Sequence, residues 1–417
     1  MKRFLSILLV AAMVLTMGAA ALAEDREKVV FWHLWTGNGA AIVDEIVANF
    51  NASQDKYTVE ALSVPDEQKI KVAIAGGQGP DVTDSFSANV PSYAGQNIMY
   101  CLDELIARDG VDMNQFIPAA AASCAYDGKQ YAFPISLNLM MLFYNKDLFA
   151  AKNLEAPKTD EDLLNAAIAL TEMNADGSMK VLGYPDFPWV YYLDNFAYAL
   201  GASYTNEDDT ECTIDSEGFR RALEMMVAYR DKFGVENVTR FQSGGAYLDG
   251  TDPFLNNAQA MRVDGPWMNA NMVAAGKADL NYGVVPLPYL KGHEDQAGRA
   301  LVSSSMFYIP ATAKNVEGGW AFLQYITLGE GGDLFVTKGG SLPAKASMLN
   351  NETLMALPDY PAFAELAASP NLTMLPRFEN WGDYSKLIGD EAQLVVNGKQ
   401  TIDEAIKHIE DYAADLF

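Results

Sequence analysis

The feature that most constrains the fold is an alternation of strand-like and helix-like segments between residues 29 and 84. Residues 29–32, 57–62 and 81–84 are short runs of apolar or β-branched residues, which are typical of buried strands. One face of residues 40–50 carries apolar side chains at helical spacing, namely Ile42, Val43, Ile46, Val47 and Phe50. Residues 67–75 form a second helical segment that ends at a glycine-rich stretch. Strands separated by helices predict a mostly parallel sheet with helices on its faces.

Further strand-like and helix-like segments follow, and the 417 residues of the chain are too many for one ordinary hydrophobic core. A second unit begins with FPISLNLMMLFYN at 133–145, whose apolar run predicts one long strand. Capping boxes that begin at Thr159 and Thr401 predict two helices, the first extending to Leu170. Residues 219–233 predict another helix. We therefore expect two α/β domains.

The N-terminal end has the pattern of a secretory signal peptide. Lys2 and Arg3 precede an apolar stretch at 4–17, and Ala21-Leu22-Ala23 fits a small-x-small cleavage site. A membrane anchor is disfavoured, because the apolar run is short and small residues follow it. We expect residues 1–23 to be removed and the protein to be exported, to a periplasm or to the outer face of the cell membrane.

Charge and cysteine content narrow the classes of partner. A formal net charge of −26 argues against nucleic acid and anionic membrane surfaces as partners, because both attract clustered Lys and Arg. The cysteines are Cys101, Cys124 and Cys212, so at least one lacks a partner within the chain. Their spacings are too wide for a zinc site. A disulfide between Cys101 and Cys124 stays open in an oxidising compartment.

Cofactor and metal motifs fail at specific positions. Gly37-Asn38-Gly39 begins like a dinucleotide-binding loop, but Ile42 stands where a third Gly or Ala is required. The Gly-Lys pairs lack the Ser or Thr of a phosphate-binding loop. The three histidines are scattered along the chain and do not have the spacing of a zinc site. A calcium-like run at 172–177 has Gly183 where a bidentate Glu is needed, so a turn is the better interpretation and calcium the open alternative. We expect no cofactor, no metal and no catalytic residue.

Large aromatic residues stand in loop contexts beside polar residues. Trp35 follows the first strand, Trp267 follows a Gly-Pro pair, and Trp381 lies within RFENWGDY. The segment GYPDFPWVYYLDNF at 183–196 holds several more, Trp189 among them. A sugar ring has an apolar C–H face and a polar rim, so its site needs flat aromatic side chains and hydrogen-bonding groups. We expect these tryptophans to contact a ligand, and Trp32, within the strand itself, to belong to the core.

Six segments in order resemble an extracellular solute-binding protein of an ABC importer, of the maltose-binding type. They are FWHLWTGNG (31–39), VAIAGGQGPDV (72–82), YAFPISLNLMMLFYNKDLF (131–149), PKTDEDLL (157–164), AMRVDGPW (260–267) and NYGVVPLP (281–288). The resemblance covers nearly all of the mature chain. It implies a periplasmic-binding-protein fold, in which two α/β lobes joined by crossing strands close around a ligand. The implied lobes are 24–136 plus 286–328 and 139–281 plus 333–417, with the hinge near 136–139, 281–286 and 328–333.

The resemblance also implies ligand contacts by position. Small polar residues stand at Ser85 and Asn89, where maltose binders place aromatic and charged contacts, which argues against maltose itself. Asn138 stands where maltose binders place an acid, and Trp267 matches the family's Gly-Pro-Trp aromatic. The complete implied set is Trp35, Thr36, Asn38, Ser85, Asn89, Asn138, Trp189, Tyr191, Asp194, Asp264, Trp267, Arg377 and Trp381.

The function implied by the resemblance is binding without catalysis. The protein is expected to be a monomer that carries a mono- or oligosaccharide to a membrane permease with its ATPase. Two alternatives stay open. An exported carbohydrate-active enzyme needs a facing pair of carboxylates in the cleft. A receptor for a non-sugar solute such as a polyol phosphate needs clustered Arg or Lys, whereas only Arg377 is basic in the implied set, which favours a neutral ligand.

Overall fold

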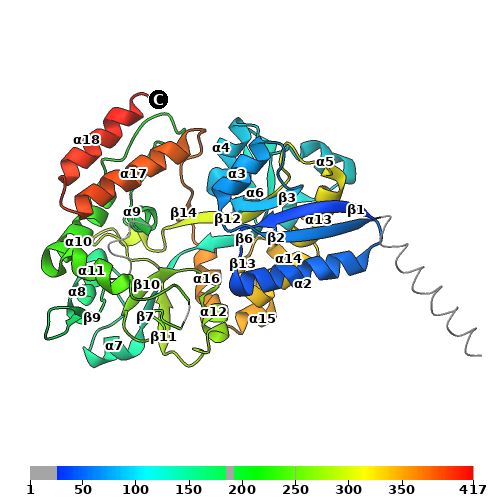
Figure 1. Cartoon of the computed structure of the whole chain (residues 1–417). Coiled ribbons are helices and arrows are strands. Elements are labelled where there is room, and N and C mark those ends of the chain that lie inside the picture. The colour runs from blue at the N-terminus through cyan, green and yellow to red at the C-terminus, as the bar shows by residue number, and fades with distance from the viewer. Residues whose placement is uncertain (1–25, 185–191, 249, 417) are drawn as a thin grey trace, which may run out of the picture.

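The computed structural model describes residues 26–184, 192–248 and 250–416. The expected signal peptide at 1–23 and the expected ligand contacts Trp189 and Tyr191 lie outside this part of the chain. Figure 1 shows two groups of helices and strands side by side, with β6 and β12 running between them, which is the two-lobed α/β arrangement predicted from the sequence. Within the described ranges, no helix has both the length and the apolar character needed to cross a membrane.

The larger sheet has seven strands and forms the centre of the first group. Its main path is β13 (Leu342–Pro343), β6 (Ala132–Leu139), β12 (Ala300–Tyr308), β3 (Val82–Phe86), β1 (Glu27–His33) and β2 (Tyr57–Ser63), and β14 (Leu372–Thr373) pairs with β12. β1 is parallel to both β2 and β3, which confirms the sheet predicted for residues 29–84. β12 is antiparallel to β3 and β6, so the complete sheet is mixed rather than mostly parallel.

The helices of the first group bury the faces that the sequence predicts. The buried side chains of α2 (Gly37–Ser53) are the five apolar residues of the predicted stripe. Gly37 has a φ of 53°, a left-handed conformation that glycine adopts without strain and that turns the chain into α2. The other helices of this group are α3 (Glu67–Ala75), α4 (Val90–Gly95), α5 (Asp103–Asp109), α6 (Pro118–Ser123), α13 (Val316–Thr327) and α14 (Glu330–Gly339).

The second group is built around a three-stranded sheet in the order β10 (Met261–Asp264), β7 (Met141–Asn145) and β11 (Tyr282–Val285). Both strand pairs are antiparallel, unlike the mostly parallel sheet expected for this lobe. Its helices are α7 (Lys146–Ala151), α8 (Asp160–Leu170), α9 (Leu193–Ala199), α10 (Glu217–Phe233), α11 (Val235–Gln242), α17 (Trp381–Val396) and α18 (Ile402–Ala413). The predicted capping boxes at Thr159 and Thr401 are both formed, at the starts of α8 and α18.

Three further α-helices are short, namely α12 (Met268–Ala274), α15 (Glu352–Met355) and α16 (Tyr360–Ala367). Two small hairpins pair β4 (Ala125–Tyr126) with β5 (Lys129–Gln130) and β8 (Glu172–Met173) with β9 (Met179–Val181). Buried residues of α12 and α16 belong to the same hydrophobic cluster as the larger sheet, and so does Phe143 of β7. This cluster therefore extends from the first group toward the second, beneath the crossing strands. A separate cluster fills the space between β7, β10 and the helices α8 to α10 and α17.

In the part of the chain that the structure describes, three passages connect the two sheets. The first is Met140, which separates β6 from β7, so residues 133–145 form two strands in different sheets and not the single strand predicted. Both strands are buried except at Tyr144, and a mostly apolar run cannot show where the sheet changes. The second passage lies between β11 and β12. The third follows β14, because β13 and β14 pair within the larger sheet, whereas α17, the next helix, packs on α10 and α18 of the second group. The sequence analysis instead expects this passage near 328–333.

Candidate functional site

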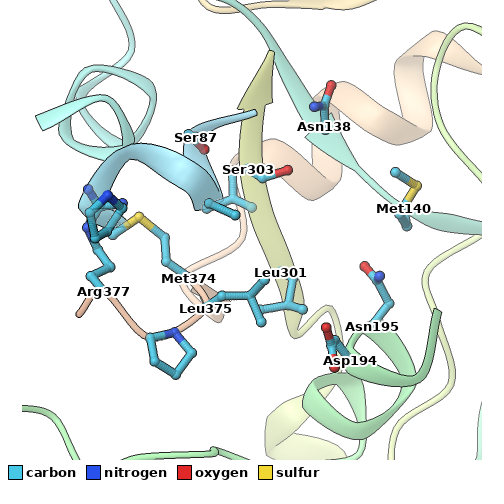
Figure 2. Close-up of a pocket in the computed structure, with 14 residues that line it drawn as sticks. Ser87, Asn138, Met140, Asp194, Asn195, Leu301, Ser303, Met374, Leu375 and Arg377 are labelled. Carbon is cyan, nitrogen blue, oxygen red and sulfur yellow. The ribbon is translucent and has the colours of Figure 1, made fainter. Parts of the chain in front are cut away.

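A cleft between the two groups of elements consists of two adjoining pockets. The larger has a volume of about 730 Å³ and the smaller of about 100 Å³. Asn138, Met140 and Ser303 line both, so the pockets meet at the crossing strands β6 and β12. Figure 2 shows the smaller pocket, with Ser303 on β12 and with Asp194 and Asn195 on the helix across from it.

Aromatic side chains line the larger pocket from both groups. Phe86, at the end of β3, is 47% exposed, and Tyr247, in the loop after α11, is 58% exposed. Trp267 directly precedes α12. Its indole Nε1–H donates a hydrogen bond of 3.0 Å to the Tyr247 hydroxyl, which fixes the two rings relative to each other. The cleft therefore offers apolar ring surface from the larger sheet and from the second group.

Asp264, the last residue of β10, is a buried carboxylate that lines the larger pocket. Its Oδ1 accepts hydrogen bonds from the Tyr247 hydroxyl at 3.0 Å and from the backbone N–H of Gly265 at 2.9 Å. Its Oδ2 has no hydrogen-bond partner among the described residues. Burial raises the pKa of Asp264 to about 6, although nearby Arg262 acts in the opposite direction.

Arg262 is the basic residue in the described lining of the larger pocket, and its charge is already paired. Its guanidinium makes two hydrogen bonds of 2.8 Å with the two carboxylate oxygens of Asp252. The same group lies over the rings of Tyr247 and Phe254, at 5.5 and 5.4 Å from their centroids. Arg262 therefore supports the aromatic wall and neutralises Asp252.

The described lining of the smaller pocket contains one acidic and one basic residue. Asp194, in the first turn of α9, accepts a hydrogen bond of 2.7 Å from the Tyr204 hydroxyl, and burial raises its pKa to about 6. Arg377 donates to the backbone carbonyls of Ser123, at 3.1 Å, and Ala125, and burial lowers its pKa. The guanidinium of Arg377 is thus committed to the end of α6.

Among the described residues of the set implied by the resemblance, five line this cleft. They are Asn138, Asp194, Asp264, Trp267 and Arg377. Asn138 lies on β6, directly opposite Ser303 of β12, and its amide donates to the Ser305 hydroxyl at 3.2 Å. The crossing strands themselves therefore supply polar groups at the point where the two pockets meet.

Other described members of that set lie outside the lining of these two pockets. Trp35 packs against Phe307 and Phe335 of the first group, while Thr36 and Asn38 are exposed at the start of α2. Ser85 and Asn89 both donate hydrogen bonds to Glu67, the first residue of α3. In this structure these two side chains join α3 to the end of β3.

Trp381 lies in the core of the second group and not in the cleft lining. It is 4% exposed and packs with the rings of Tyr204, Phe378 and Tyr384. Trp381 and Tyr384 lie one turn apart on α17 and are both buried, whereas Asp383 between them is exposed. Trp32, expected in the core, is partly buried against a third hydrophobic cluster.

The sequence analysis missed several side chains of the cleft. Phe86 directly follows Ser85, and Asn195 directly follows Asp194, so each lies one residue beyond a position that the resemblance assigns. Tyr247 lies two residues after a Gly-Gly pair, and an aromatic residue in a glycine-rich loop is the kind of signal that pointed to Trp267. Met140 and Gln242 carry no local signal that separates them from core or surface residues.

Comparison with known sequences shows which family the chain resembles. The family described as bacterial extracellular solute-binding protein matches residues 45–364. The maltotriose-binding protein of Pyrococcus abyssi is 26% identical over 307 residues, which are 72% of this chain and 62% of that protein, less than two thirds of its length. The sn-glycerol-3-phosphate-binding periplasmic protein UgpB of Brucella abortus is 26% identical over 307 residues, covering 69% of this chain and 67% of that protein.

Solved structures share the fold. CpMnBP1 with mannobiose bound has a TM-score of 0.83 and 22% identity, covering 93% of this chain and 100% of that chain. The GacH receptor of Streptomyces glaucescens has a TM-score of 0.78 and 23% identity, covering 94% and 98%. The predicted two-lobed fold is confirmed by this likeness.

Proposed function

The chain belongs to the bacterial extracellular solute-binding protein family, and we propose that it is the exported binding component of an ABC importer for a mono- or oligosaccharide. The sugar binds in the cleft, and the protein, a monomer, delivers it to a membrane permease with its ATPase. The signal-peptide pattern at 1–23 supports export, to a periplasm or to the outer face of the cell membrane. The maltotriose-binding relative supports a carbohydrate ligand.

The observation that carries this proposal is the combination of exposed aromatic faces and polar side chains in one cleft. Phe86, Tyr247 and Trp267 offer ring surface, and Asn138 and Ser303 offer hydrogen-bonding groups. Stacking one sugar ring removes apolar surface from water and contributes roughly 1–3 kcal/mol. Two such contacts with satisfied hydrogen bonds correspond to about micromolar affinity.

The charges of the cleft argue against a polyol phosphate, although several relatives are sn-glycerol-3-phosphate-binding proteins. Among the described lining residues, the basic ones are Arg262 and Arg377. The first is paired with Asp252, and the second is bonded to backbone carbonyls. A phosphate needs available Arg or Lys donors, and the carboxylates of the cleft repel it.

The arrangement of carboxyl groups favours binding over catalysis. Glycoside hydrolysis needs two carboxyl groups that face each other across the scissile bond. Asp194 is the one carboxylate in the described lining of the smaller pocket, and Asp264 is the one in the larger. Each accepts a hydrogen bond from a tyrosine hydroxyl. We therefore propose a protein that binds its sugar without converting it.

Thermal unfolding with a ligand panel tests this function. The full mature chain is heated alone and with maltotriose, mannobiose or sn-glycerol 3-phosphate, and the ligand is recovered and analysed afterwards. A ligand at a thousandfold excess over its Kd adds about 4 kcal/mol of stability. We expect at least one neutral sugar to raise the Tm and to be recovered intact. Stabilisation by sn-glycerol 3-phosphate alone, or recovery of a cleaved sugar, would contradict the proposal.

A further inference from the structure

Two hydrogen-bond acceptors in the larger pocket have no donor in the described part of the protein. Asp264 Oδ2 and Gln242 Oε1 are both buried, and both residues line this pocket. They come from separate elements, because Asp264 ends β10 and Gln242 ends α11. A buried acceptor without a donor is unfavourable, so such groups in native proteins are nearly always paired with protein, water or ligand.

The hydrogen bonds that Asp264 Oδ1 accepts determine which oxygen of this carboxylate has no donor. Because the Tyr247 hydroxyl accepts the indole hydrogen of Trp267, its own hydrogen is available for Asp264 Oδ1. The Gly265 N–H gives Oδ1 a second donor. The carboxylate is therefore held in one orientation, and Oδ2 is the atom left without a donor.

The nearest basic side chain does not supply that donor. The guanidinium of Arg262 lies in the same pocket, but it is paired with both oxygens of Asp252. Its Nη2 also donates to Gln259 at 3.3 Å. The pocket lining thus contains two buried acceptors without a donor, and its positive charge is already neutralised within the protein.

We propose that Asp264 and Gln242 form an acceptor subsite that binds hydroxyl donors of one sugar ring and makes the cleft selective against anionic solutes. This inference rests on the proposed function and assigns its selectivity to two residues. A sugar ring stacked on the aromatic wall carries hydroxyl hydrogens at its rim, which Oδ2 and Oε1 can accept. A phosphate or carboxylate brings acceptors and negative charge, which both oxygens disfavour.

Titration calorimetry on variants tests the subsite, with maltotriose, mannobiose and sn-glycerol 3-phosphate as probes. In Asp264→Asn, the amide oxygen is needed by Tyr247 and Gly265, so an NH₂ donor replaces Oδ2 in the subsite. We expect the affinity for the neutral sugar to fall about tenfold or more and its advantage over sn-glycerol 3-phosphate to shrink. The control is Asp390→Asn on α17, an exposed carboxylate outside the cleft, for which the affinity should not change.

Gln242 provides the second, independent variant pair. Gln242→Leu removes the acceptor and should weaken sugar binding about tenfold, whereas Gln242→Glu keeps an acceptor and should bind the sugar like the wild type. If a neutral sugar binds the wild type but Asp264→Asn and Gln242→Leu bind it within twofold, the subsite is overturned while the proposed function stands. If no neutral sugar binds the wild type, the proposed function itself fails. Should Asp264→Asn not fold, the two Gln242 variants decide the outcome.

Discussion

At the scale of single residues, Tyr247 organises the larger pocket. Its hydroxyl accepts from Trp267 and donates to Asp264, and its ring lies beside the guanidinium of Arg262. One side chain therefore positions an aromatic face and the carboxylate next to it. Residues that act through such a network are coupled, so their substitutions are not expected to be additive.

Trp267 and Trp381 should respond to substitution in opposite ways. Trp267→Ala removes an aromatic face of the cleft, so we expect sugar affinity to fall far more than the free energy of unfolding. Trp381→Ala empties a position in the second core, which should lower the free energy of unfolding by about 3–5 kcal/mol. Denaturant unfolding of the free protein and calorimetry with sugar separate the two effects. A strong loss of apo stability in Trp267→Ala, with unchanged affinity, would place that residue in the core.

The raised pKa of Asp264, about 6, gives a pH dependence of defined sign. A donor-bearing ligand binds the carboxylate form, so the affinity for a neutral sugar should fall as pH drops through about 6. Apo stability follows the opposite trend. A carboxyl whose folded pKa exceeds its unfolded value of 3.8 stabilises the fold at low pH, and that contribution is lost as pH rises from about 4 to about 6.

The difference between the wild type and Asp264→Asn isolates this residue, because burial also raises the pKa of Asp194 and Asp359 to about 6. Calorimetry between pH 5 and pH 8 should show the acid-side loss of affinity in the wild type and a smaller loss in the variant. Identical pH profiles for the two proteins would show that Asp264 does not receive the ligand.

At the scale of elements, the correct predictions rest on local sequence patterns. The strand–helix alternation gave β1 to β3 in parallel order, and both capping boxes mark true helix starts. The division of residues 133–145 at Met140 has no local signature, because both strands are mostly buried and mostly apolar. The third passage between the sheets depends on the pairing of β13 and β14, which are two residues long and too short for a pattern to predict.

The cleft residues are likewise predicted best where a local motif fixes their position. The resemblance led to Asp264 and Trp267 because they belong to one short motif, AMRVDGPW, which fixes their position. Tyr247 reaches the same pocket from a loop after α11, and only the tertiary fold brings it within 3.0 Å of both Trp267 and Asp264. Charged neighbours in the sequence suggested a ligand contact for Trp381, but the direction of its side chain from α17 places it in the core.

At the scale of the whole molecule, the cleft is shared by the two groups of elements. Phe86 and Ser303 come from the larger sheet, and Tyr247, Asp264 and Trp267 from the second group. A ligand that touches both groups stabilises the arrangement in which they approach each other, which is the physical basis of ligand-driven closure. The crossing strands β6 and β12 form the floor that both pockets share.

A crystal structure of the full mature chain grown with the neutral sugar that most raises the Tm tests the central claim most directly. The account predicts a sugar ring in the larger pocket, with its face against Tyr247 or Trp267 and a hydroxyl within hydrogen-bond distance of Asp264 Oδ2. It also predicts that Arg262 stays paired with Asp252. A sugar bound elsewhere on the molecule, with the larger pocket holding only water, would contradict it.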